Sequence, residues 1–112
     1  ITATSLPEAV TTRSLSVQLL LGGTQLVMGA SGAVVRPMLV AGGRQVGAAG
    51  LAIGADLDRA TGCLTLEPNK PVTVAFVLSD DTVPAVRIVV QDPATDAELY
   101  RSPADIPVRL GV

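Results

Sequence analysis

Apolar and polar side chains alternate with a period of two along much of this 112-residue chain, and this pattern constrains its fold most. Residues two apart point to the same face of a β-strand, so alternation predicts strands that bury one face. No segment sustains the i, i+3, i+4, i+7 spacing of an amphipathic helix. We therefore expect an all-β fold, with strands in the segments Leu15–Leu21, Leu51–Leu57, Leu64–Leu66, Val72–Leu78, Val86–Val90 and Ile106–Leu110.

Two further segments bear on the strand prediction. Ala33–Val40 is a nearly continuous apolar run that suits a central strand, but Pro37 has no N–H to donate and favours an edge or a bulge there. Gly42–Gly47 and the nearby Gly50 supply glycines without the Gly-Lys-Ser/Thr of a phosphate loop. We interpret them as a flexible connection between strands.

Two segments resemble one another, and both predict hairpin loops: Asp58–Leu64 and Asp92–Leu99. In each, the first Asp opens a turn by accepting hydrogen bonds from backbone N–H groups. Gly62 in one and Asp96 in the other can take the left-handed conformation that closes it. Since the similarity stops before the flanking strands, shared turn chemistry explains it better than a duplicated unit.

A longer stretch carries a family resemblance. Leu66 to Phe76 reads Leu-Glu-Pro-Asn-Lys-Pro-Val-Thr-Val-Ala-Phe. It is similar to the L-x-P-x-x-x-V-T-V-x-F stretch of many bacterial immunoglobulin-like and fibronectin-III-like modules. The resemblance covers about 15 residues, from Leu64 to Leu78, and departs in having Asn69-Lys70 where such modules usually carry Gly and in lacking a Cys-Trp-Cys core. It implies a sandwich fold and nothing about a ligand or an activity.

The alternation and this resemblance lead to one fold prediction. A chain of this length suits one domain with one core. We expect a single β-sandwich over residues 1–112 with about seven to nine antiparallel strands, immunoglobulin-like or fibronectin-III-like in the broad sense. Residues 1–13 are expected to be an N-terminal extension or a short turn.

The residue inventory excludes most catalytic and cofactor chemistry. With no His, the chain cannot form a Ser-His-Asp triad, a Cys-His pair or a His-ligated metal site, and its one Cys, Cys63, cannot form an internal disulfide. One Phe, one Tyr and no Trp leave no platform for stacking on sugars or bases. The eight basic residues are spread singly, and the net charge is −2. We expect no enzymatic activity, no cofactor and no nucleic-acid partner.

One metal hypothesis stays open. Asp56, Asp58 and Glu67 occupy positions one, three and twelve of an EF-hand register, which makes them weak calcium candidates. The register then fails, because Thr61 stands at position six, where the sharp turn needs Gly, and no helices flank the loop. Acids solvated in turns are the ordinary alternative.

The location of the chain rests on two observations. Ser14–Val35 is uncharged between two arginines, as in a short membrane span, but Gln, Ser, Thr and Gly interrupt it. We therefore expect no membrane span. The chain begins at Ile1 without a basic or apolar leader, which we interpret as a cleaved signal peptide or a domain of a longer chain. We expect an extracytoplasmic location: periplasm, cell surface or virion.

Several segments are apolar on both faces, and a small monomer has little interior to bury them. A protein partner or self-association would cover the excess. The interface candidates are Leu19, Leu20, Leu21, Leu26, Val27 and Met28. We expect a non-enzymatic structural or protein-interaction module of an extracytoplasmic bacterial or phage assembly. The alternatives are a small-ligand or calcium-binding sandwich, although a small-molecule ligand is not the first expectation, and a periplasmic chaperone or inhibitor acting through a strand edge.

Overall fold

The computed structural model describes residues 2–4, 8–21 and 32–110. Within them the chain forms ten strands and no helix, and every pairing between these strands is antiparallel. The strands are β1 Thr2–Thr4, β2 Ser14–Leu20, β3 Ala33–Ala41, β4 Arg44–Ile53, β5 Leu57–Asp58, β6 Cys63–Leu66, β7 Val72–Leu78, β8 Ala85–Gln91, β9 Glu98–Arg101 and β10 Ile106–Pro107. The prediction of an antiparallel all-β fold is confirmed. The number of described strands exceeds the expected number of about seven to nine. The count includes three very short strands, β1, β5 and β10, of two or three residues each.

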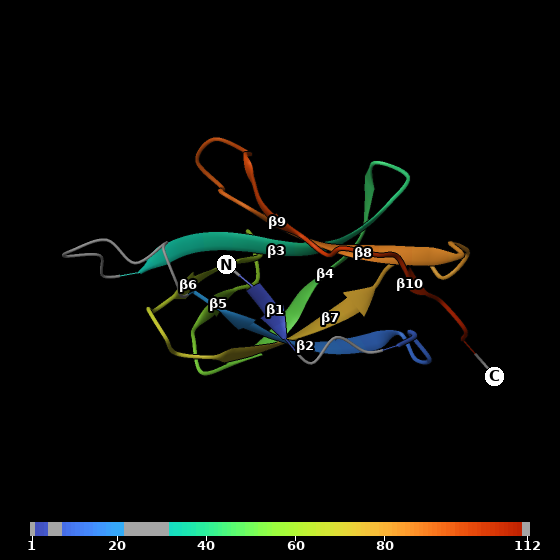
Figure 1. Ribbon diagram of the computed structural model, residues 1–112, viewed down its shortest axis with the longest axis horizontal. Coiled ribbons are helices and arrows are strands. Elements are labelled where there is room, and N and C mark those ends of the chain that lie inside the picture. Colours follow the sequence, from blue (N-terminus) through green and yellow to red (C-terminus); the bar gives the residue numbers. More distant parts are fainter. Residues whose placement is uncertain (1, 5–7, 22–31, 111–112) are drawn as a thin grey trace.

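The strands belong to one sheet that curls into a half-barrel (Figure 1). Its main path runs β1-β2-β7-β4-β3-β6-β5, while β8 pairs with β3 and carries β9 and β10. In Figure 1, β3 and β8 lie along the upper side, β2 and β7 along the lower side, and β4 descends from one to the other. The curl places two groups of strands on either side of the core.

β4 joins the two sides of the curl. Its first part pairs with β3, and the stretch from Gly47 to Ile53 pairs with β7. The register shifts between Ala49 and Leu51 on the β7 side, and on the β3 side a second shift skips Val46 of β4. Such bulges bend a strand and increase its twist, so they help to turn the sheet. The expectation of a flexible connection is wrong for Gly47 and Gly50, which lie inside β4.

β3 is a central strand in spite of its proline. It pairs with β6 through Ala33–Val35, with β8 through Arg36–Val40 and with β4 through Met38–Ala41. Pro37 falls between the β6 and β4 pairings, where β3 has only β8 as a partner. A residue without an N–H is therefore accommodated inside the sheet. The sequence-based expectation of an edge or a bulge at Pro37 is wrong: the nearby register shift, between Leu39 and Val40, leaves the extra residue, Val46, in β4.

The core is aliphatic and fills the inside of the curl. Alternate residues of β2, β7 and β8 are buried there, as the periodicity predicts, and Phe76 in β7 is fully buried among them. Val10 belongs to the same cluster and bridges to Val108, so part of the 1–13 segment packs into the domain. The largest fully buried side chains are Val10, Val17, Leu19, Val35, Leu39, Val46, Leu66, Val72, Val74, Phe76, Val86 and Ile88.

The two similar segments form the predicted hairpin loops. In each, the carboxylate of the opening Asp accepts the N–H two residues later, at 3.0 Å for Asp58 and 2.9 Å for Asp92. Gly62 and Asp96 have φ values of 73° and 59°, and each donates its N–H to the carbonyl of the opening Asp at 2.7 Å. The turn chemistry expected from the sequence is thus confirmed at both loops.

The uncharged segment between Arg13 and Arg36 has the outline of a short membrane span in the sequence. Its first seven residues form β2, and residues 22–31 lie outside the described part. In the part that the structure describes, no helix has the length and apolar character needed to span a membrane.

A polar cluster ties the β7–β8 turn to the start of β4. The carboxylate of Asp80 accepts hydrogen bonds from the hydroxyl and the N–H of Thr82 and forms an ion pair with Arg44. The Thr82 hydroxyl, followed by the Arg44 guanidinium, holds the pKa of Asp80 well below its usual range. The ionised form of Asp80 is therefore favoured by the folded state.

We expect Asp80→Asn to lower stability at neutral pH and to lose this effect in acid. A carboxylate whose pKa is depressed by folding contributes stability above its unfolded pKa of about 4, and the contribution is lost as pH falls from there through the folded pKa. Thermal unfolding from about pH 7 to about pH 2 should therefore show the two melting temperatures converging in acid. Asp56→Asn is the control, because Asp56 has no hydrogen bond or ion pair to the described residues. If the melting temperature of Asp80→Asn stayed below that of the wild type by the same amount in acid, this account would be contradicted.

Candidate functional site

The outside of the curl carries an uncharged face over β2, β7 and β4. The strand register sets Ser16 beside Ala75 and Ala75 beside Leu51, with Val77 and Ile53 in the neighbouring rows. These side chains point away from the core because the alternate positions of the same strands are buried. We call this surface the β2–β7–β4 face; its outward residues are Ser14, Ser16, Gln18, Ala48, Leu51, Ile53, Thr73, Ala75 and Val77.

Three large aliphatic side chains dominate this face. Leu51 is 52% exposed, Ile53 65% and Val77 52%. A single exposed aliphatic residue is ordinary, whereas neighbouring ones on adjacent strands form a patch of the kind that marks interaction surfaces. The other residues of the face have hydroxyl, amide or methyl side chains. A partner could therefore cover these residues without desolvating a charged group among them.

The bulge in β4 shapes the centre of this face. A Cβ on Gly50 would stand 2.9 Å from a methyl carbon of Val77, so the glycine lets the two strands approach closely there. The sequence contained a signal for this surface: Leu51 and Ile53 are apolar residues two apart, and Val77 lies in a strand, Val72–Leu78, whose second face is also uncharged. Periodicity alone could not place these strands side by side.

The interface residues predicted from the sequence lie elsewhere. Leu19 and Leu21 are buried in the core, and Leu20 is half-buried. The side chains of consecutive residues in an extended segment alternate between its two faces, so a run of three leucines cannot present all of them to one partner. Leu26, Val27 and Met28 lie outside the described residues.

The calcium candidates are not assembled into a site. The Asp58 carboxylate accepts a hydrogen bond from the Ala60 N–H within its own turn, and Glu67 forms an ion pair with Lys70 at 3.4 Å. Asp56 and Glu67 line a hollow of about 670 Å³ together with Lys70, but Asp58 is not part of its lining. Across residues 2–4, 8–21 and 32–110, no three His, Cys, Asp or Glu side chains are grouped so that they could hold a metal ion.

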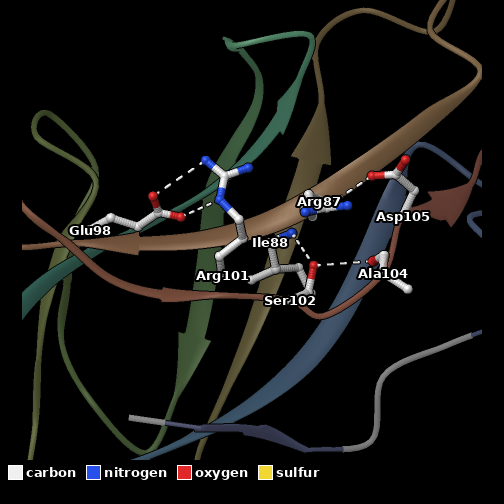
Figure 2. Close-up of polar contacts among 7 residues, drawn as sticks. All are labelled: Arg87, Ile88, Glu98, Arg101, Ser102, Ala104 and Asp105. Carbon is white, nitrogen blue, oxygen red and sulfur yellow. Dashed lines mark hydrogen bonds and ion pairs between the residues drawn. The ribbon is translucent and has the colours of Figure 1, made fainter.

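The other outer surface, over β3, β8 and β9, is charged. Arg87 pairs with Asp105 at 2.9 Å, and Arg101 pairs with Glu98 (Figure 2). These side chains lie on the same side of the ribbon in Figure 2. Exposed pairs of this kind contribute little to stability, about 0–1 kcal/mol. They make this surface chemically distinct from the uncharged β2–β7–β4 face.

A buried serine holds the segment after β9 against β8. The Ser102 hydroxyl accepts the N–H of Ile88 at 3.1 Å and donates to the carbonyl of Ala104 at 3.4 Å (Figure 2). The Ser102 N–H also donates to the Ile88 carbonyl at 2.9 Å. Because its hydroxyl and its N–H are engaged in this way, we assign this serine a structural role.

Comparison of the chain with protein-family models, with curated proteins and with solved structures found no match.

Proposed function

We propose that this domain is a non-enzymatic protein-interaction module that associates with a second copy of itself through the β2–β7–β4 face. The observation that carries the proposal is the exposure of Leu51, Ile53 and Val77 on adjacent strands, without a charged residue among them. A partner that covers these side chains removes apolar surface from water, which is the main driving force of association.

The charge pattern favours a second copy as the partner. A twofold contact brings one patch against the same patch, so an uncharged face meets an uncharged face and no like charges are opposed. The small side chains Ser16 and Ala75 lie between the large ones and leave room for the opposite face to pack closely. The net charge of −2 opposes association only weakly.

Lysine substitutions on the face test this proposal. We expect Leu51→Lys or Ile53→Lys to weaken dimerisation by about 100-fold or more, because each dimer would then bury two unpaired charges. Sedimentation equilibrium from about 10 μM to about 1 mM would measure the dissociation constant. The wild-type chain should form dimers at the upper end of this range, with both variants monomeric and still folded by circular dichroism.

Val34→Lys is the matched control. Val34 is 54% exposed and lies in β3, away from the β2–β7–β4 face. This variant should dimerise as the wild type does. A wild-type chain that stays monomeric over the whole range, or a Val34→Lys variant that dissociates as fully as Ile53→Lys, would contradict the proposal.

We propose in addition that the half-barrel is a variant of the immunoglobulin-like sandwich, and that the module serves an extracytoplasmic bacterial or phage assembly. The two strand groups β2–β7–β4 and β3–β8–β9 on either side of an aliphatic core support the first part. The absence of His and the scarcity of aromatic residues in the sequence support a role without catalysis. An experimental structure in which β2–β7 and β3–β8 do not face each other would overturn the sandwich assignment.

A further inference from the structure

A groove of about 520 Å³ lies on the outer face of β3 and β4 and borders the β2–β7–β4 face at Ala48, which pairs with Val77. The β5–β6 turn, residues 59–62, forms part of its lining. No Asp or Glu lines it, and its polar side chains are those of Arg36, Gln45, Arg59, Thr61 and Gln91. The volume falls within the range of about 300–1,000 Å³ that is usual for sites of small ligands.

Arg36 is held in a fixed position at this groove. Its Nη2 donates to Gln91 Oε1 at 2.8 Å and to Asp96 Oδ1 at 2.7 Å. A Cβ on Gly62 would stand 3.8 Å from Arg36 Cγ, so the aliphatic part of the side chain lies beside the β5–β6 turn. The two similar hairpin loops therefore flank Arg36. Its Nε and Nη1 have no partner among the described residues and remain available to donate to a ligand.

Arg59 supplies a second, unneutralised charge. Six other basic residues form ion pairs, whereas Arg59 has none with the part of the chain that the structure describes. Its backbone is positioned by the turn between Asp58 and Gly62, which both hydrogen-bond within the loop. A guanidinium without a carboxylate partner at a groove free of acids favours an anionic ligand.

The remaining lining is apolar. Met38, Val40 and Ala48 contribute to it, and Met38 is buried although it is not part of the core cluster. The register places Met38 directly beside Ala48, so the two form a continuous apolar strip across β3 and β4. A ligand that reaches both arginines and this strip needs a charged end and an apolar body.

We propose that this groove binds a small aliphatic carboxylic acid. The carboxylate accepts hydrogen bonds from Arg59 and from the free N–H groups of Arg36, and the aliphatic chain lies against Met38 and Ala48. The carboxamides of Gln45 and Gln91 can satisfy any remaining acceptor of the ligand. The groove borders the β2–β7–β4 face at Ala48, but its lining includes none of the three large exposed residues of that face, Leu51, Ile53 and Val77.

Titration of the ¹⁵N-labelled protein with sodium hexanoate tests the proposal. We expect saturable shifts of the backbone amide signals of Arg36, Met38 and residues 59–62. Arg59→Gln should weaken binding by about tenfold or more, because it removes a charged hydrogen-bond donor. Arg109→Gln is the matched control: Arg109 also lacks an ion pair in the described residues and lies outside the groove, so its loss should leave the dissociation constant unchanged.

Two further probes separate the parts of the ligand. 1-Hexanol should bind much more weakly because it has no charge, and inorganic phosphate should bind more weakly because it has no apolar body. Absence of saturable shifts with hexanoate, equal loss of binding in Arg59→Gln and Arg109→Gln, or phosphate binding as tight as that of hexanoate would each overturn the proposal.

Discussion

Phe76→Ala is expected to lower the free energy of unfolding by about 3–5 kcal/mol. Phe76 is fully buried in β7, between Leu15 of β2 and Ala49 of β4 in the sheet register. It is the only Phe of the chain, and its truncation leaves a cavity that the surrounding aliphatic side chains cannot fill without moving. Because a domain of this kind is stable by only about 5–15 kcal/mol, the loss would be a large part of the total.

Urea denaturation of the wild type and the variant would measure this loss. Val34→Ala is the control, since it also truncates an aliphatic side chain but at an exposed position. It should change the free energy of unfolding by less than about 1 kcal/mol. Similar losses in the two variants would show that Phe76 is not at the centre of the core.

Gly47→Val is expected to cost about 3 kcal/mol or more. Gly47 pairs with Leu39 of β3 and with Leu78 of β7, so it stands where β4 belongs to both sides of the curl. A Cβ there would lie 2.9 Å from the carbonyl oxygen of Val77 and 2.9 Å from Leu39 Cδ1. Neither the backbone nor the buried leucine can yield without disturbing the sheet.

Gly50→Val in the same strand is the comparison. A Cβ on Gly50 would meet only a methyl group of the exposed Val77 at short range, and that side chain can rotate towards solvent. We expect a clearly smaller loss of stability, measured in the same urea experiment. Equal destabilisation of the two variants would show that the close contacts around Gly47 do not account for its loss of stability.

The sequence predicted those parts of the fold in which local chemistry decides the structure. Alternation located β2, β7 and β8 because each buries one face. The loops at Asp58 and Asp92 were predicted because their hydrogen bonds form within a few residues. The part of β4 before Leu51 was missed, since Gly47 and Gly50 lack the side chains that reveal a period, and its partners in β7 are far away in the sequence.

The candidate surfaces were harder to predict than the fold. Leu51 and Val77 become neighbours only through the pairing of β4 with β7, which no local pattern specifies. The groove likewise depends on the β5–β6 turn lying beside Arg36, which is distant from Arg59 in the sequence. By contrast, the leucine run at Leu19 was conspicuous in the sequence, but it supplies the core.

The double pairing of β4 has a consequence for how the domain loses its structure. Within the described strands, the ladder of hydrogen bonds passes from β7 to β3 through β4. If β4 detached, the strands on each side would lose both a neighbour and part of the shared core. Neither side can therefore serve as a separate cooperative unit, and the backbone amides of β4 should exchange with solvent only when the whole domain opens.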